Sequence, residues 1–118
     1  MIKDKTGIWG ETYTVRYLRD KGYGIVTTNY STPLGEIDVI ANEGKTLAFI
    51  EVKTRRIGAL HAPAEYVDRE KQRKIAAVAT TFMSKHIEGD YFARFDVAEV
   101  YVDDSYKLVS INYIQNAF

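Results

Sequence analysis

The sequence predicts a single α/β domain, residues 1–118, in which one helix precedes three strands and a second helix precedes two more. A chain of 118 residues has the length of one domain, and its 46% of hydrophobic residues is enough for a core. Apolar residues recur at helical spacing in two segments, whereas β-branched and aromatic residues fill the segments between and after them. The resulting order is α-β-β-β-α-β-β.

The first half of the chain begins with a helix and continues with a meander of strands. We expect the helix to run from a cap at Asp4 or Thr6 to about Lys21, before two glycines that end it. Its apolar stripe consists of Ile8, Val15 and Leu18. The expected strands cover residues 23–30, 36–41 and 46–53, with turns at residues 31–35 and 42–45.

The second half contains the other helix and a hairpin. A loop that contains Gly58 and Pro63 leads to a helix from an N-cap at Asp68 to about His86. The residues expected to face the core from this helix are Ile75, Val78, Ala79 and Phe82. Two strands at residues 91–102 and 106–114, joined at residues 103–105, are expected to pair antiparallel.

Composition excludes several classes of chemistry and of partner. The absence of cysteine removes thiol nucleophiles, thiolate zinc sites and iron–sulfur clusters, and it fits a reducing compartment. No apolar run approaches the roughly 20 residues of a membrane span, so we expect a cytoplasmic protein without a membrane partner. Because the formal net charge is +0, any binding of nucleic acid must use a local basic patch.

Acidic residues stand where the strand pattern expects apolar ones. In the third strand Leu47 and Phe49 are followed on the same face by Glu51 and Lys53. In the second strand Asp38 shares a face with Glu36 and Ile40, opposite Ile37, Val39 and Ala41. We expect Asp38 and Glu51 on neighbouring strands, where two carboxylates repel unless a proton or a cation intervenes. A divalent ion bound by oxygen ligands relieves that repulsion, and Glu11 on the first helix's stripe adds a third carboxylate.

Each of these residues also has an ordinary explanation. Glu11 can lie at the edge of its stripe and reach water, Asp38 can be a solvated strand residue, and Glu51 can form a salt bridge with Lys53. A local cluster of basic residues follows the third strand and opens the second helix: Lys53, Arg55, Arg56, Arg69, Lys71, Arg73 and Lys74. Such a cluster is either a solvated helix face or a surface for phosphate groups.

Several ordered motifs give the chain a resemblance to known proteins. Gly-Glu-Ile-Asp at residues 35–38 and Glu-Val-Lys-Thr-Arg at residues 51–55 resemble the Asp…Glu-x-Lys signature of the PD-(D/E)xK nuclease superfamily, which has a restriction-endonuclease-like fold. More closely, the chain is similar to the YraN-like family of small uncharacterised proteins. The further motifs that carry this likeness are at residues 10–11, 17–18, 71–73 and 94–97.

The superfamily resemblance implies a mixed sheet flanked by helices and a metal-dependent hydrolysis of DNA phosphodiesters, including branched or damaged DNA, with RNA not excluded. It implies Mg²⁺ or Mn²⁺ held by Asp38 and Glu51, Lys53 beside the attacking water and the scissile phosphate, and Glu11 as an accessory acid. The residues implied to contact the nucleic-acid backbone are Arg55, Arg56, Lys71, Gln72 and Arg73. A homodimer is compatible with this activity, because cutting both strands of a duplex needs two sites.

Two other classes of protein fit the same sequence. One is a catalytically inactive nucleic-acid-binding or adaptor module that keeps the nuclease fold, for which divalent binding need not depend on Asp38 and Glu51. The other is a structural protein in which Glu51 and Lys53 form a salt bridge. In that case Glu51→Gln should destabilise the fold, whereas at a metal site in the metal-free protein it can stabilise the fold by relieving repulsion.

Overall fold

The computed structural model describes residues 6–57 and 67–118 of the chain. The expected cap at Asp4 and the loop with Gly58 and Pro63 lie outside the described residues. The elements follow the predicted order: α1 (Thr6–Asp20), β1 (Gly24–Thr32), β2 (Gly35–Glu43), β3 (Thr46–Arg56), α2 (Arg69–His86), β4 (Phe92–Val102) and β5 (Leu108–Ile114). No helix in these two ranges is long and apolar enough to cross a membrane.

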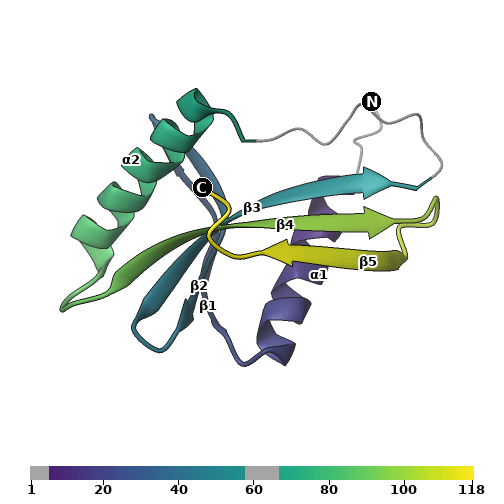
Figure 1. Cartoon of the computed structure of the whole chain (residues 1–118), viewed down its shortest axis with the longest axis horizontal. Coiled ribbons are helices and arrows are strands. Elements are labelled where there is room, and N and C mark those ends of the chain that lie inside the picture. Colours follow the sequence, from purple (N-terminus) through teal and green to yellow (C-terminus); the bar gives the residue numbers. More distant parts are fainter. Residues whose placement is uncertain (1–5, 58–66) are drawn as a thin grey trace.

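The strands form one mixed five-stranded sheet in the order β1-β2-β3-β4-β5 (Figure 1). β3 and β4 run parallel with α2 in the connection between them, whereas the other neighbours pair antiparallel. This arrangement confirms the predicted mixed α/β fold, the central position of β3 and the antiparallel pairing of the last two strands.

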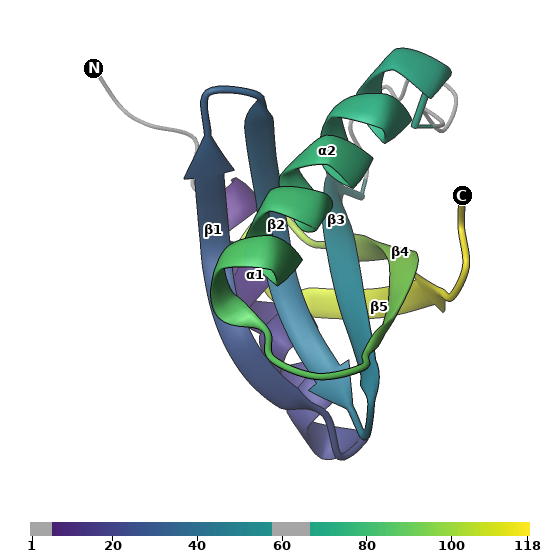
Figure 2. The same ribbon diagram turned by 90° about the vertical axis from the view of Figure 1, so that its left-hand side faces the viewer.

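The helices cover opposite faces of the sheet. Figure 2 shows α2 in front of the strands and α1 behind them. On the α2 face, the predicted stripe of Ile75, Val78, Ala79 and Phe82 is buried against Leu47 and Phe49 of β3. On the α1 face, Leu18 packs against a second cluster that includes Ala48, Ile50 and Val100. The N-cap of α2 is Asp68 as predicted, because its side chain accepts a hydrogen bond from the Lys71 backbone nitrogen at 2.8 Å.

The buried row of α1 differs from the predicted stripe. Ile8 is 62% exposed, and the buried residues of the helix are Gly10, Thr14 and Leu18. The reason is a close approach of α1 to β3, where a Cβ placed on Gly10 would lie only 1.8 Å from Thr54 Oγ1. A residue without a side chain therefore fits this contact, and a search for large apolar residues overlooks it.

The alternation of faces along β2 is also interrupted. Ile37 belongs to the same core cluster as Ile40, whereas Val39 and Ala41 belong to the cluster under α1. The prediction that Ile37 shares a face with Val39 is therefore wrong. Strict alternation requires a continuous ladder, but the backbone pairing of β2 with β3 ends at Val39 opposite Ile50. The interruption falls at Asp38, the residue on which the candidate site is centred.

Candidate functional site

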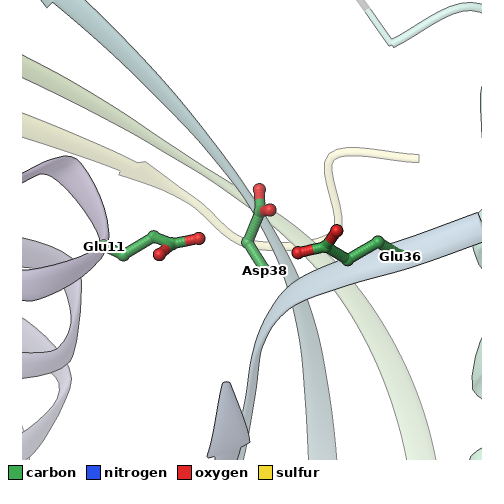
Figure 3. Close-up of side chains that lie close together, drawn as sticks. All are labelled: Glu11, Glu36 and Asp38. Atoms are coloured by element: carbon green, nitrogen blue, oxygen red, sulfur yellow. The ribbon is translucent and has the colours of Figure 1, made fainter. Parts of the chain in front are cut away.

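Three carboxylates converge where β2 leaves its ladder with β3. Glu11 comes from α1, while Glu36 and Asp38 come from β2, and one oxygen of each lies within 4.8 Å of the others. Figure 3 shows Asp38 between the two glutamates, whose side chains reach toward it from opposite sides. Asp38 and Glu11 are half-buried and Glu36 is exposed, so the group lies at the surface, where a solute can reach it.

Asn29 of β1 stands beside this group and joins its two glutamates. With its amide turned so that the nitrogen donates, that nitrogen lies 2.7 Å from Glu11 Oε1 and 2.9 Å from Glu36 Oε1. Its backbone has a φ of 53°, in the left-handed region that asparagine tolerates better than most residues. The amide thus brings together two side chains that would otherwise repel each other.

Asp38 has the most perturbed carboxyl group of the cluster. Its Oδ2 accepts a hydrogen bond from the Val52 backbone nitrogen at 2.8 Å. Burial, together with the negative charges of Glu51, Glu11 and Glu36, raises the pKa of Asp38 to about 7 despite that hydrogen bond. Burial and the charge of Glu36 likewise raise the pKa of Glu11, and the hydrogen bond from Asn29 opposes this. The site therefore carries negative charge that nearby cations do not fully balance.

Glu51 has a different environment, because lysines surround it. The Lys71 Nζ of α2 lies 2.5 Å from Glu51 Oε1, and the Lys53 Nζ lies 4.0 Å from the same oxygen. The Glu51 side chain is only 10% exposed. Burial alone would lower the pKa of Lys71, but the hydrogen bond and the charge of Glu51 outweigh burial, so that the pKa of Lys71 is raised.

The structure brings together most of the residues that the sequence singled out, although in two groups. Asp38 and Glu51 lie on neighbouring strands, close enough for the charge of Glu51 to raise the pKa of Asp38. Glu11 joins Asp38, while Lys53 and Lys71 join Glu51. The Asp38 carboxylate thus has acidic neighbours, whereas the Glu51 carboxylate has basic ones.

The residues implied to contact nucleic acid flank these groups. Arg55 and Arg56 end β3, with Arg56 exposed. In the first turns of α2 the Gln72 side chain donates to the Val67 carbonyl at 2.7 Å, and Arg73 is exposed. The Lys71 amine pairs with Glu51, although its side chain is still 45% exposed, whereas Arg69 and Arg73 are exposed on the same helix.

Sequence reasoning did not select Glu36 as a site residue. The signal was its position two residues before Asp38 in the same strand, which put both on one predicted face. What the sequence did not show is that Asn29 links Glu36 to Glu11, because contacts between distant segments depend on the register of β1 on β2.

The fold and the site define a class of protein: a small α/β domain with a mixed sheet between two helices and a carboxylate cluster beside a lysine pair at the end of one strand ladder. Residues 10–100 match the Uncharacterised protein family UPF0102. The chain is 43% identical to a UPF0102 protein of Caldicellulosiruptor bescii over 97% of both chains. It is 46% identical to one of Alkaliphilus oremlandii over 99% of this chain and all of the relative. The protein belongs to the UPF0102 family, the YraN-like family that its motifs indicated.

Proposed function

We propose that this protein is a metal-dependent nuclease that hydrolyses phosphodiester bonds of DNA at the site formed by Glu11, Glu36, Asp38, Glu51 and Lys53. The observation that carries the proposal is the convergence of carboxylates from α1 and β2 beside the Glu51–Lys53 pair of β3. It agrees with the Asp…Glu-x-Lys resemblance of the sequence, and it adds Glu36 to the residues that the resemblance implied.

The carboxylate group fits a hard divalent cation. Mg²⁺ and Mn²⁺ prefer oxygen ligands, and two oxygens on opposite sides of Mg²⁺ lie about 4 Å apart, twice the metal–oxygen distance. Adjacent ligands lie about 3 Å apart, so the three carboxylates, whose ligand atoms lie within 4.8 Å of one another, would have to move together by roughly 1–2 Å to share one ion. The raised pKa of Asp38 points the same way, because it reflects negative charge that a cation would neutralise.

We assign the residues the following parts. Asp38 lies between the two glutamates of the cluster and would hold the ion with them, and Glu51 on the adjacent strand would be a further ligand. A bound divalent ion lowers the pKa of a water ligand and neutralises charge that develops on a phosphate. Lys53, only 18% exposed and next to Glu51, holds a fixed positive charge for a phosphate oxygen. Arg55, Arg56, Gln72 and Arg73 would contact the rest of the backbone.

The experiment that tests this proposal is cleavage of end-labelled single-stranded, duplex and four-way-branched DNA at low salt in Mg²⁺ and in Mn²⁺. Asp38→Ala, purified in the same way, should show no cleavage, because it removes the central carboxylate. Glu36→Gln should cut more slowly than the wild type. Glu43→Gln, which changes an exposed glutamate at the end of the same strand, is the matched control and should cut normally.

Cleavage that persists in Asp38→Ala would assign the activity to a contaminant and contradict the proposal.

A second candidate is the catalytically inactive nucleic-acid-binding module. The ion pairs of Glu51 with Lys71 and Lys53 favour it, because they neutralise one proposed metal ligand without any metal. Binding of DNA by both proteins, with no cleavage by either in either metal, would support this second function.

A further inference from the structure

A cavity of about 480 Å³ lies between α2, β4 and the segment that follows β5. Its lining consists of Arg69, Gln72, Arg73, Ala76, Phe95 and Phe118. The first four belong to one side of the helix, Phe95 belongs to β4, and Phe118 follows β5. A volume of this size lies within the range of pockets that bind small molecules and nucleotides.

The floor of this cavity is a stack of aromatic rings. Phe118 stacks on Phe95 with ring centroids 5.4 Å apart, and Phe95 in turn stacks on the buried Phe49 at 5.7 Å. Phe118 is therefore the outermost ring of a column that is rooted in the core. A further flat ring can stack in this cavity in the same way.

Buried polar contacts hold the outer ring in place. The fully buried Asp96 accepts hydrogen bonds from the Asn116 backbone nitrogen at 3.1 Å and from the Tyr113 hydroxyl at 2.6 Å. Arg94 compensates the charge of Asp96 at 2.9 Å. In addition, the Ala117 backbone nitrogen donates to the Phe95 carbonyl at 2.8 Å. The segment after β5 is thus fixed beside Phe95 before any ligand binds, which lowers the entropy cost of binding.

The rim of the cavity is positively charged. Arg69 and Arg73 lie one turn apart on α2, both exposed, and neither forms an ion pair with another residue in the described ranges. Glu70 of the same helix pairs instead with Lys74 at 3.6 Å. Two guanidinium groups above an aromatic floor complement a phosphate next to a nucleobase.

This cavity lies close to the proposed catalytic site. Phe95 pairs with Phe49 across the parallel ladder, and Glu51 stands two residues further along β3, which is about 7 Å at the usual rise of a strand. A single strand that passes the proposed site can therefore reach the cavity.

We infer that the cavity between α2 and Phe118 binds an unpaired nucleotide of a single-stranded or branched nucleic acid, with the base on the Phe95–Phe118 stack and the phosphate between Arg69 and Arg73. The inference rests on the proposed function and specifies its substrate class. A base within a duplex cannot enter, because both of its faces are already stacked on neighbouring bases.

The test is the binding of fluorescein-labelled DNA measured by anisotropy in EDTA, where cleavage does not interfere. Wild-type protein should bind a single strand more tightly than a duplex, or than the same strand with abasic sites. Phe118→Ala should weaken binding of the base-bearing strand by roughly tenfold and remove the difference from the abasic strand. Arg73→Gln should reduce the slope of log K against log salt concentration by about one, the value expected for the loss of one phosphate contact.

Matched variants distinguish the loss of base stacking from a general loss of structure, aromatic surface or charge. Phe92→Ala removes an aromatic ring of β4 that is 75% exposed and outside the cavity, and Lys85→Gln removes a charge from the other end of α2; both should bind DNA like the wild type. Phe118→Trp should keep the affinity, and the fluorescence of its indole should be quenched by the base-bearing strand only. The melting temperature of each variant shows whether it is folded.

The inference is overturned if the abasic and base-bearing strands bind equally, if Phe118→Ala binds like Phe92→Ala, or if the wild type binds no single strand. These results leave the nuclease proposal standing wherever cleavage still depends on Asp38. Conversely, stacking at Phe118 in EDTA without any cleavage in Mg²⁺ or Mn²⁺ would support the cavity and contradict the nuclease.

Discussion

At the level of single residues, Asp38 and Glu51 show how neighbouring carboxylates can have opposite effects on stability. Glu51 is compensated by Lys71 and Lys53, so its charge is favourable in the metal-free protein. Asp38 has one backbone hydrogen bond but three acidic neighbours, and its pKa is raised to about 7. Substitutions that remove the two charges should therefore change the free energy of unfolding in opposite directions.

Asp38→Asn should stabilise the metal-free protein at about pH 8 and flatten its pH dependence. Between pH 4 and 7 the folded wild type keeps a proton on Asp38 that the unfolded chain has lost, so stability falls as the pH rises through this window. The loss is at most about 4 kcal/mol, at 1.36 kcal/mol per pKa unit. Asparagine can still accept the hydrogen bond from Val52.

Urea unfolding in EDTA at several pH values measures the effect of Asp38→Asn on the free energy of unfolding, with Asp104→Asn in an exposed turn as the control. A wild-type stability that rises over this window would contradict the prediction.

Glu51→Gln should destabilise the metal-free protein, by about 1–2 kcal/mol, whether or not Glu51 also binds a metal, because it leaves Lys71 and the half-buried Lys53 without their carboxylate. This is less than the about 3–5 kcal/mol of a fully buried pair, because the Lys71 side chain is 45% exposed. Glu70→Gln, which breaks the exposed Glu70–Lys74 pair, should cost less than about 0.5 kcal/mol. Urea unfolding of both variants in EDTA makes the comparison. If Glu51→Gln were stabilising, repulsion from Asp38 would outweigh both lysines.

At the level of elements, the position of Glu11 depends on how closely α1 lies on β3. Gly10 precedes Glu11 and meets Thr54, so the contact that fixes the helix is next to the carboxylate that the helix supplies. Gly10→Ala should destabilise the protein by about 1–3 kcal/mol through overpacking. Gly7→Ala in the same helix meets no atom within 4 Å and should stabilise the protein by about 0.5–1 kcal/mol.

Thermal unfolding of the two glycine variants checks this contrast. Adding Thr54→Ala to Gly10→Ala should recover part of the loss, because the nearest atom to the new Cβ is the removed hydroxyl. Equal effects of alanine at positions 7 and 10 would mean that helix propensity, rather than packing against β3, decides the outcome.

The elements show how far the sequence alone could predict this protein. The spacing of apolar residues and the positions of turn and capping residues were sufficient to predict the order of helices and strands, the apolar stripe of α2 and the N-cap at Asp68. These signals are local in the sequence. The break in β2 at Asp38 depends on where the ladder of β2 with β3 ends, and the Gly10 contact depends on how α1 packs against β3, so neither has a local signal. For the same reason the sequence indicated Asp38 and Glu11 but not the link through Asn29 to Glu36, which requires the register of β1 on β2.

At the level of the whole molecule, the neutral net charge conceals a separation of charges between an acidic site and a basic one. Acidic side chains from α1 and β2 gather at one site, while Arg69 and Arg73 of α2 line the cavity beside Phe118. A protein arranged in this way need not attract nucleic acid over long distances. Binding of a phosphate at the carboxylates themselves should instead depend on a cation there, which would convert a repulsive surface for phosphate into an attractive one, whereas the cavity beside Arg69 and Arg73 needs no metal to bind nucleic acid.

A divalent ion at the carboxylates should also stabilise the entire fold, because its ligands come from α1 and from β2. At a Mn²⁺ concentration of 100 times Kd, linkage adds about 2.7 kcal/mol to the free energy of unfolding. For a domain of this size that amounts to an increase in melting temperature on the order of 10 °C. The increase should disappear in Asp38→Asn and shrink in Glu36→Gln, while Glu43→Gln should keep it in full. Differential scanning fluorimetry with a Mn²⁺ titration measures all four proteins. An unchanged increase in Asp38→Asn would place the ion elsewhere, because Asp38 is the carboxylate that lies between the two glutamates of the cluster (Figure 3).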